Sequence, residues 1–313
     1  MANERPLLAI GTRGSPLALA QARMTAAALA EAGGVPVEEI AIEVISTTGD
    51  RTQDRPLSEI GGKGLFTKEI DHAQLDGRVD VAVHSSKDLP TVLPDGLVIA
   101  GFLPREDVRD ALIAPRYRTL DSLPAGARVG TVSLRRQALV RQLRPDLQVE
   151  ALRGNVETRL NRARTGDFEA VILAMAGLKR LGLDGEVTEA LDPIRFIPAV
   201  GQGAIALVTR ADDTKSRDLI ARFAHHATAV ELAAERAFLA VLDGSCRTPI
   251  GGNARYENGR IRFRGIVLTP DGTAAHAIEA EAPEAEAETL GAALGHQLRE
   301  RMGPGFLDVK PGA

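Results

Sequence analysis

Aromatic residues are scarce in this sequence, and tryptophan is absent. Phenylalanine, tyrosine and tryptophan together account for 3% of the 313 residues. Proteins that hold single-stranded nucleic acid stack its bases on aromatic rings, so the composition argues against that function. The formal net charge of −4 gives no support to nonspecific binding of nucleic acid either. We therefore expect no nucleic acid among the partners of this protein.

Long apolar runs are missing as well. No stretch is long enough to span a membrane, and the N-terminal sequence has no long apolar segment preceded by positive charge, as a signal peptide would. Cysteine occurs once, at Cys246, which rules out an internal disulfide and suits a reducing compartment. These features predict a cytoplasmic protein without a membrane partner.

The single cysteine lies in a segment rich in turn-forming residues. Gly244 precedes Cys246 by two positions, Arg247 follows it, and Pro249 comes soon after. An adjacent guanidinium favours the thiolate, which is the nucleophilic form of the side chain. A free cysteine is also commonly a small buried hydrophobe. On this segment alone, a reactive thiol and a core residue both remain open.

The hydrophobic pattern predicts an α/β protein followed by a small α+β region. Short apolar runs alternate with helical segments in two successive sets, with strands expected at 7–10, 41–45, 79–83, 97–102, around 129–130, 148–151 and 170–174. A helix from residue 228 leads to a hairpin around Asn258-Gly259, a third strand at 274–282 and a helix from about 284 to 301.

We interpret two segments, residues 104–107 and 198–204, as connections between the α/β lobes. We therefore predict three domains: domain 1 from residues 1–103 and 204–222, domain 2 from 108–198, and domain 3 from 225–313. The third would be an α+β domain with a three-stranded antiparallel sheet, and it would carry Cys246.

Similar turns open a helix in both predicted lobes. Each has a strand, then Gly-Thr, then a serine that can cap a helix, at Gly11 to Ser15 and at Gly130 to Ser133. A helix N-terminus directly after a strand is a ready anion site, and Arg13 lies in the first of these turns. Plain helix capping beside a solvated arginine is the alternative.

Polar residues cluster where the strand at 79–83 ends. His84-Ser-Ser-Lys-Asp-Leu-Pro follows it directly, and α/β sheets bind ligands at the carboxyl ends of their strands. We interpret Asp88 as a candidate acid or base. A turn-stabilising Asp88 and a structural His84 are the alternatives.

A long polar segment at residues 46–63 contains Gly49, Pro56 and Gly61-Gly62, and we predict that it is a lid. The glycines around Lys63 lack the spacing of a nucleotide P-loop. Gly201-Gln202-Gly203 lacks the third glycine and the preceding strand of a dinucleotide fingerprint. A nucleotide-dependent enzyme is therefore disfavoured.

Basic residues recur at matching places, mostly in glycine-bounded turns at strand ends or helix starts. Arginine's planar fork suits carboxylates and phosphates. The set predicts a site that binds a polyanion, and it consists of Arg13, Lys63, Lys87, Arg135, Arg136, Arg153, Arg159 and Arg180.

These residues resemble the porphobilinogen deaminase (hydroxymethylbilane synthase) family. The motifs follow the family's order from about residue 7 to 252, whereas the C-terminal sixth matches mainly in predicted architecture. They are Gly11-Thr-Arg-Gly-Ser-Pro-Leu-Ala, Gly61-Gly-Lys-Gly-Leu-Phe, His84-Ser-Ser-Lys-Asp-Leu-Pro, Ser133-Leu-Arg-Arg, Leu152-Arg-Gly-Asn-Val, Ala176-Gly-Leu-Lys-Arg-Leu-Gly, Pro198-Ala-Val-Gly-Gln-Gly and Gly244-Ser-Cys.

The resemblance implies two lobes similar to type II periplasmic solute-binding proteins and a third domain with the cysteine. It implies a deaminating transferase of porphyrin and heme biosynthesis, with a dipyrromethane cofactor joined to Cys246 by a thioether. Four porphobilinogen molecules would condense head to tail on this cofactor and release ammonia, giving hydroxymethylbilane for uroporphyrinogen III synthase. No metal is implied, and since nothing indicates an obligate interface, we expect a monomer.

The family's site residues carry over to this chain. Asp88 would contact the cofactor, assist loss of the amino group and stabilise the azafulvene cation. The other implied cofactor ligands are Cys246, Lys87, Thr131, Ser133, Arg135 and Arg136. The implied substrate-binding residues are Arg13, Ser15, Lys63, Phe66, Arg153, Arg159, Arg180 and Gln202.

Three positions depart from the family pattern. Many members have a basic residue at the place of Ala9, a lysine at Glu59 and a serine at Val132. We expect these departures to change single carboxylate contacts rather than the reaction. The main alternative is a two-lobed protein that captures an anion without chemistry. It accounts for the lobes and arginines but leaves Asp88 and Cys246 without a role.

Overall fold

A computed structural model describes residues 7–51, 66–242 and 248–308. Cys246, Lys63 and most of the predicted lid therefore lie outside the described residues. The chain divides into two compact units, which are described separately. Unit 1 comprises Met1–Arg105 and Ala204–Ala229, and unit 2 comprises Glu106–Gly203 and Val230–Ala313.

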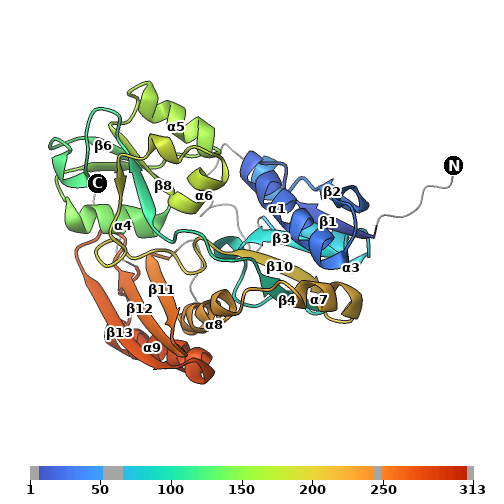
Figure 1. Ribbon diagram of the computed structural model, residues 1–313. Coiled ribbons are helices and arrows are strands. Elements are labelled where there is room, and N and C mark those ends of the chain that lie inside the picture. The colour runs from blue at the N-terminus through green and yellow to red at the C-terminus, as the bar shows by residue number, and fades with distance from the viewer. Residues whose placement is uncertain (1–6, 52–65, 243–247, 309–313) are drawn as a thin grey trace. The chain divides into compact units, whose positions relative to one another are not determined.

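Unit 1 is built on a five-stranded mixed sheet (Figure 1). In spatial order its strands are β2 (Ile40–Val44), β1 (Leu8–Thr12), β3 (Val81–Ser85), β10 (Ile205–Arg210) and β4 (Leu97–Phe102). The first three are parallel, and β10 runs antiparallel to both its neighbours. The helices of this unit include α1 (Pro16–Gly33), α2 (Thr48–Arg51), α3 (Lys68–Leu75) and α7 (Thr214–Ala221).

Local sequence explains how α1 begins and ends. Ser15 caps it and Pro16 occupies the first turn, where proline's missing N–H costs nothing. Gly34 ends it in the left-handed conformation, with φ 65°, which favours glycine. Leu29 and neighbouring alanines of α1 pack in a buried cluster with Leu8, Ile10 and Val81 of the sheet. The predicted first strand and helix are confirmed.

Unit 2 contains a second five-stranded sheet with the same pattern. In spatial order its strands are β7 (Gln148–Glu150), β6 (Arg128–Gly130), β8 (Ala170–Ala174), β5 (Asp110–Ile113) and β9 (Glu189–Ala190). Again the first three are parallel, and the fourth runs antiparallel to the third. Its helices include α4 (Leu134–Leu143), α5 (Val156–Arg164) and α6 (Met175–Arg180).

A third, antiparallel sheet also belongs to unit 2, with strands β11 (Ile250–Glu257), β12 (Arg260–Leu268) and β13 (Ala275–Pro283) in that order. The predicted hairpin turn is confirmed, since Asn258 and Gly259 have φ values of 52° and 74°. Helices α8 (His226–Val241) and α9 (Ala287–Met302) contribute to its core, in which Phe238 lies 4.8 Å from Phe263 between ring centres. The predicted fold class, two α/β lobes and a C-terminal α+β part, is confirmed.

The turn between β12 and β13 packs against α4. A Cβ atom on Gly272 would lie 2.6 Å from the carbonyl oxygen of Ala138, so only glycine permits this approach. The Arg141 guanidinium donates a hydrogen bond to the Pro270 carbonyl at 3.0 Å. These contacts join the second and third sheets, and both sheets belong to unit 2. The division into three domains remains our prediction.

Two elements were not predicted from the sequence. One is α6, which forms through Gly177 to Arg180 because Gly177 and Leu178 are buried within it. The strand β5, which follows the expected linker at 104–107, was not predicted. It begins with Asp110, and aspartate is normally depleted in strands.

Candidate active site

Four candidate residues of unit 1 lie at one edge of its sheet. The parallel strands β1 and β3 pair Gly11 with Ala82, so their carboxyl ends point the same way. Arg13 and Ser15 follow β1. Lys87 and Asp88 belong to a short 3₁₀ helix, Ser86–Asp88, that follows β3. This edge is where α/β sheets place their ligands.

The turn after β1 holds Arg13 between a helix start and an aromatic ring. The Ser15 side chain accepts a hydrogen bond from the Ala18 N–H at 3.3 Å and so caps α1. The Arg13 guanidinium carbon lies 4.2 Å from the centre of the Phe66 ring, within range of a cation–π interaction. The cation is thus half-buried and fixed from one side.

Next to this turn, His84 is buried and neutral. Burial, and secondarily the charge of Arg13, lowers the pKa of His84 to about 4. Among the described residues its Nε2 atom has no hydrogen-bond partner. Further along, Lys87 is half-buried and Asp88 is exposed. Asp88, the candidate acid or base of this edge, is therefore open to solvent.

Unit 2 places its candidates in the same way. Thr131 and Ser133 follow β6, and the Ser133 side chain caps α4 by accepting from the Arg136 N–H at 3.4 Å. Arg153 follows β7, and in α5 the Arg159 Nε donates to the Gly154 carbonyl at 2.8 Å. Because β6 pairs in parallel with both β7 and β8, these residues share one edge of the sheet.

Arg135 and Arg136 lie beneath this edge rather than on its surface. Their relative exposures are 3% and 5%, and both reach the fully buried carboxylate of Asp110. Arg136 donates to Asp110 Oδ1 from Nε at 3.0 Å and from Nη2 at 2.7 Å. Arg135 Nη2 forms an ion pair with Asp110 Oδ2 at 2.8 Å. The sequence contains no local signal for this acidic partner.

Gln202 completes the buried cluster. Its Nε2 donates to Asp110 Oδ1 at 2.9 Å and to the Val108 carbonyl at 2.8 Å, and its side chain is inaccessible to solvent. Gln202 is an expected substrate ligand. In this structure its side-chain N–H groups donate to Asp110 and to the Val108 carbonyl.

The cluster has more positive than negative charge. Burial alone would raise the pKa of Asp110, but the charges of Arg135 and Arg136 outweigh it and lower that pKa to about 2. Burial lowers the pKa of Arg135, although Asp110 opposes this effect. Two guanidiniums therefore share one carboxylate, and Arg135 Nε has no hydrogen-bond partner within the described ranges. A buried cation in surplus favours an anionic ligand.

Arg180 is at the C-terminal end of α6. Its Nη2 donates to the Gly203 carbonyl at 2.5 Å, and burial lowers its pKa to about 10, with Glu106 acting in the opposite direction. The neighbouring Lys179 pairs with Glu106 at 2.9 Å. Arg180 is thus a half-buried cation beside the end of the Pro198–Gly203 segment.

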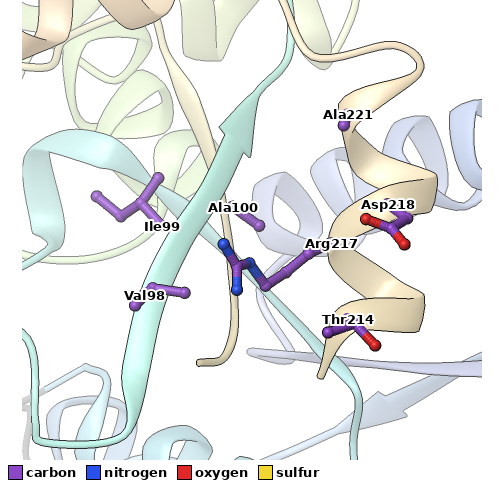
Figure 2. Close-up of a pocket in the computed structure, with 7 residues that line it drawn as sticks. All are labelled: Val98, Ile99, Ala100, Thr214, Arg217, Asp218 and Ala221. Carbon is purple, nitrogen blue, oxygen red and sulfur yellow. The ribbon is translucent and has the colours of Figure 1, made fainter. Parts of the chain in front are cut away.

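A pocket of about 360 Å³ lies elsewhere in unit 1, between β4 and α7 (Figure 2). Its lining includes Ile99, Ala100, Thr214, Arg217 and Asp218. No predicted site residue is among the residues that line it, so the candidate site does not depend on this pocket.

In the part of the chain that the structure describes, no helix combines the length and apolar composition needed to cross a membrane. Within the same residues, no group of three or more His, Cys, Asp or Glu side chains is arranged to hold a metal ion.

Basic side chains lie at the strand ends of each α/β lobe, and such side chains are suited to anionic ligands. Two family models then match nearly the whole chain. "Porphobilinogen deaminase, dipyromethane cofactor binding domain" covers residues 8–218, and "Porphobilinogen deaminase, C-terminal domain" covers 229–300. The chain belongs to the porphobilinogen deaminase family.

Individual relatives agree over nearly full length. A porphobilinogen deaminase from Nitrobacter winogradskyi is 55% identical over 307 residues, 98% of this chain and 97% of the relative. One from Nitrobacter hamburgensis is 54% identical over the same coverage. A solved lipoprotein of the YaeC family from Enterococcus faecalis is 15% identical over 69% of this chain and 89% of its own, with a TM-score of 0.41. At that score the likeness does not bear on the fold.

Proposed function

We propose that this protein is a transferase that condenses four porphobilinogen molecules head to tail, releases ammonia at each step and forms hydroxymethylbilane. The observation that carries this proposal is the 55% identity to a porphobilinogen deaminase over 98% of the chain. Both family models support it as well. The activity belongs to porphyrin biosynthesis, and the product is passed to uroporphyrinogen III synthase. The enzyme acts as a cytoplasmic monomer with three domains.

The residues of this chain fit a dipyrromethane cofactor, whose pyrroles carry acidic side chains. The buried cluster in unit 2 has two guanidiniums for one carboxylate, and Arg135 Nε lacks an acceptor among the described residues. When bound, the cofactor supplies the pyrrole end to which the first substrate is joined. The residues that hold it are Cys246, through a thioether, and Lys87, Asp88, Thr131, Ser133, Arg135 and Arg136.

Substrate binding follows from charge. Each porphobilinogen brings an acetate and a propionate, and a guanidinium binds a carboxylate through two parallel hydrogen bonds. Half-buried arginines are best placed for this, because partial burial strengthens the interaction without removing access. The proposed substrate ligands are Arg13, Ser15, Lys63, Phe66, Arg153, Arg159, Arg180 and Gln202.

Asp88 performs the proton chemistry. It donates a proton to the departing amino group, and the resulting carboxylate stabilises the positive charge left on the substrate. Its exposure at the end of the 3₁₀ helix leaves it accessible to substrate and solvent. His84 lies two residues before that helix. It is uncharged above about pH 4, so it does not compete with Asp88 as the proton donor.

A non-catalytic anion-binding protein is the alternative, and intact mass separates the two. The proposed enzyme has a mass above that of its sequence by a covalent adduct of two pyrroles, whereas a binding protein has the mass of its sequence.

Turnover provides the second part of the test. Asp88→Asn keeps the adduct and the fold but loses about 10²–10⁴ in rate, because the proton donor is gone. Asp95→Asn, which changes an exposed carboxylate seven residues further along the chain, is the matched control and turns over normally. A wild-type protein without adduct, or an Asp88→Asn enzyme with normal turnover, contradicts the proposal.

A further inference from the structure

Asp110 is an acidic residue of the site that the sequence-based set of candidates does not include. It is the first residue of β5 and is fully buried. Its backbone is held on both sides, because it pairs with Ala174 of β8 and its carbonyl accepts from the Leu191 N–H at 2.8 Å. The sheet therefore fixes the place from which the carboxylate reaches toward α4.

The two oxygens of this carboxylate serve different arginines. Oδ1 accepts from Arg136 Nε and Nη2 and from Gln202 Nε2, at 3.0, 2.7 and 2.9 Å. Oδ2 lies 2.8 Å from Arg135 Nη2. Since Oδ1 is saturated by three donors, the orientation of Arg135 depends on Oδ2.

The two guanidiniums differ in whether an N–H group remains without an acceptor. Arg136 uses Nε and Nη2 on Asp110 and donates from Nη1 to the Ile172 carbonyl at 2.9 Å. Arg135 donates from Nη1 to the Ile197 carbonyl at 2.6 Å, but its Nε has no partner in the described part of the chain. A buried N–H without an acceptor is unfavourable. Arg135 is therefore the cation in surplus.

We propose that Asp110 is a positioning residue for the cofactor: its carboxylate holds Arg135 and Arg136 so that Arg135 meets a carboxylate of the dipyrromethane. This inference rests on the proposed function. It gives Arg136 and Gln202, which donate to Asp110, the further role of orienting its carboxylate, and it gives Arg135 the contact with this ligand carboxylate. The lowered pKa of Asp110, about 2, agrees with a permanently charged partner of both arginines.

The test uses Asp110→Glu and Asp110→Asn in the full chain, produced without adduct in cells that make no porphobilinogen. Asp110→Glu keeps the charge that neutralises the arginines but displaces it by one methylene. Asp107→Asn is the matched control, since Asp107 lies in the same segment and pairs with Arg109 at 2.6 Å rather than with Arg135. Each chain receives hydroxymethylbilane, and intact mass follows adduct formation over time. Melting temperature and turnover per loaded chain are measured beside it.

We expect Asp110→Glu to acquire the adduct about 10–100-fold more slowly than wild type, because a displacement of about 1 Å at a positioning group has effects of this size. Asp110→Asn should be at least as slow, and Asp107→Asn close to wild type. If Asp110→Glu loads as fast as Asp107→Asn, the proposal is overturned even where its melting temperature is lower, since a purely structural carboxylate affects stability alone. If Asp110→Asn does not fold, Asp110→Glu decides. A wild-type chain that takes no adduct contradicts the proposed function instead.

Discussion

At the scale of single residues, His84 shows how the site limits its own positive charge. It belongs to β3, the strand that Lys87 and Asp88 follow, and it is buried, with its pKa lowered to about 4 by burial and by Arg13. A neutral imidazole adds no second cation beneath Arg13. Burial thus supports the structural interpretation of His84.

This burial predicts a pH dependence of stability. The pKa of His84 is about 4 in the folded chain and 6.5 as its ordinary value. The unfolded state therefore binds the proton first, and stability is complete above pH 6.5 and falls as the pH drops toward 4. The loss should be roughly 3 kcal/mol, from about 1.4 kcal/mol per pKa unit.

Urea unfolding at several pH values between 7 and 4 checks this prediction. His84→Asn should remove that part of the slope, whereas His296→Asn, which changes an exposed histidine of α9, should retain it. Equal slopes in wild type and His84→Asn would show that His84 is not held neutral.

The cationic residues Arg135 and Arg136 could be predicted from the sequence, but their acidic partner Asp110 could not. Arg135 and Arg136 were recognisable because Ser133 marks a helix start directly before them, and that cap is confirmed. Asp110 lies 25 or 26 residues earlier, as their numbers give, and only strand pairing brings it to them. Burial of an arginine pair cannot be inferred from composition, because arginine is ordinarily exposed.

At the scale of elements, close helix packing depends on glycine. A Cβ on Gly291 of α9 would lie 2.0 Å from the backbone carbonyl oxygen of Ala234 in α8. No side-chain rotation relieves a collision with a backbone atom. The two helices that cover the third sheet can therefore lie this close only with glycine at position 291.

Gly291→Ala tests which of two opposing effects is larger. In an open helix, alanine is favoured over glycine by about 1 kcal/mol. Here the collision should dominate and destabilise the protein by about 1–3 kcal/mol, as other overpacked substitutions do. Gly185→Ala is the control, because nothing lies within 4 Å of its added Cβ. The urea concentration at the midpoint of unfolding is measured for both variants. A Gly291→Ala protein more stable than wild type would rule out this close approach.

Element prediction succeeded where local chemistry decides and failed where tertiary contacts decide. Ser15, Ser133 and the Asn258-Gly259 turn mark their elements through caps and φ angles, and all three are confirmed. The short helix α6 contains Gly177, a poor helix former, and is stabilised by burial that the sequence does not display. Strand β5 begins with a charged residue that only its ion pairs make acceptable there.

At the scale of the whole molecule, the two α/β sheets share one strand pattern although the chain builds them differently. The antiparallel fourth strand of unit 1, β10, comes from the returning chain, whereas that of unit 2, β5, directly follows the first crossing. Alternating strands and helices in the sequence predicted two lobes, but not which strands occupy these fourth positions. The division into three domains and the lid remain predictions.

Whole-molecule electrostatics gives the last prediction. The chain is acidic overall, with a net charge of −4, yet its candidate site gathers cations such as Arg135, Arg153 and Arg159. Without an anionic cofactor these charges repel one another, so the protein without adduct should be less stable. Cys246→Ser cannot form a thioether, and it should melt lower than wild type by on the order of 5 °C at low ionic strength.

The salt dependence of the melting temperature distinguishes this charge repulsion from other causes of lower stability. Added salt screens exposed and half-buried charges such as Arg153 but not the buried Arg135, so the difference in melting temperature should shrink without disappearing. Asp88→Asn is the control, because it keeps the adduct and should show the wild-type salt dependence. Scanning calorimetry of the three proteins at low and high ionic strength measures this. A Cys246→Ser protein that differs from wild type by the same amount at every salt concentration would show that uncompensated charge is not the cause.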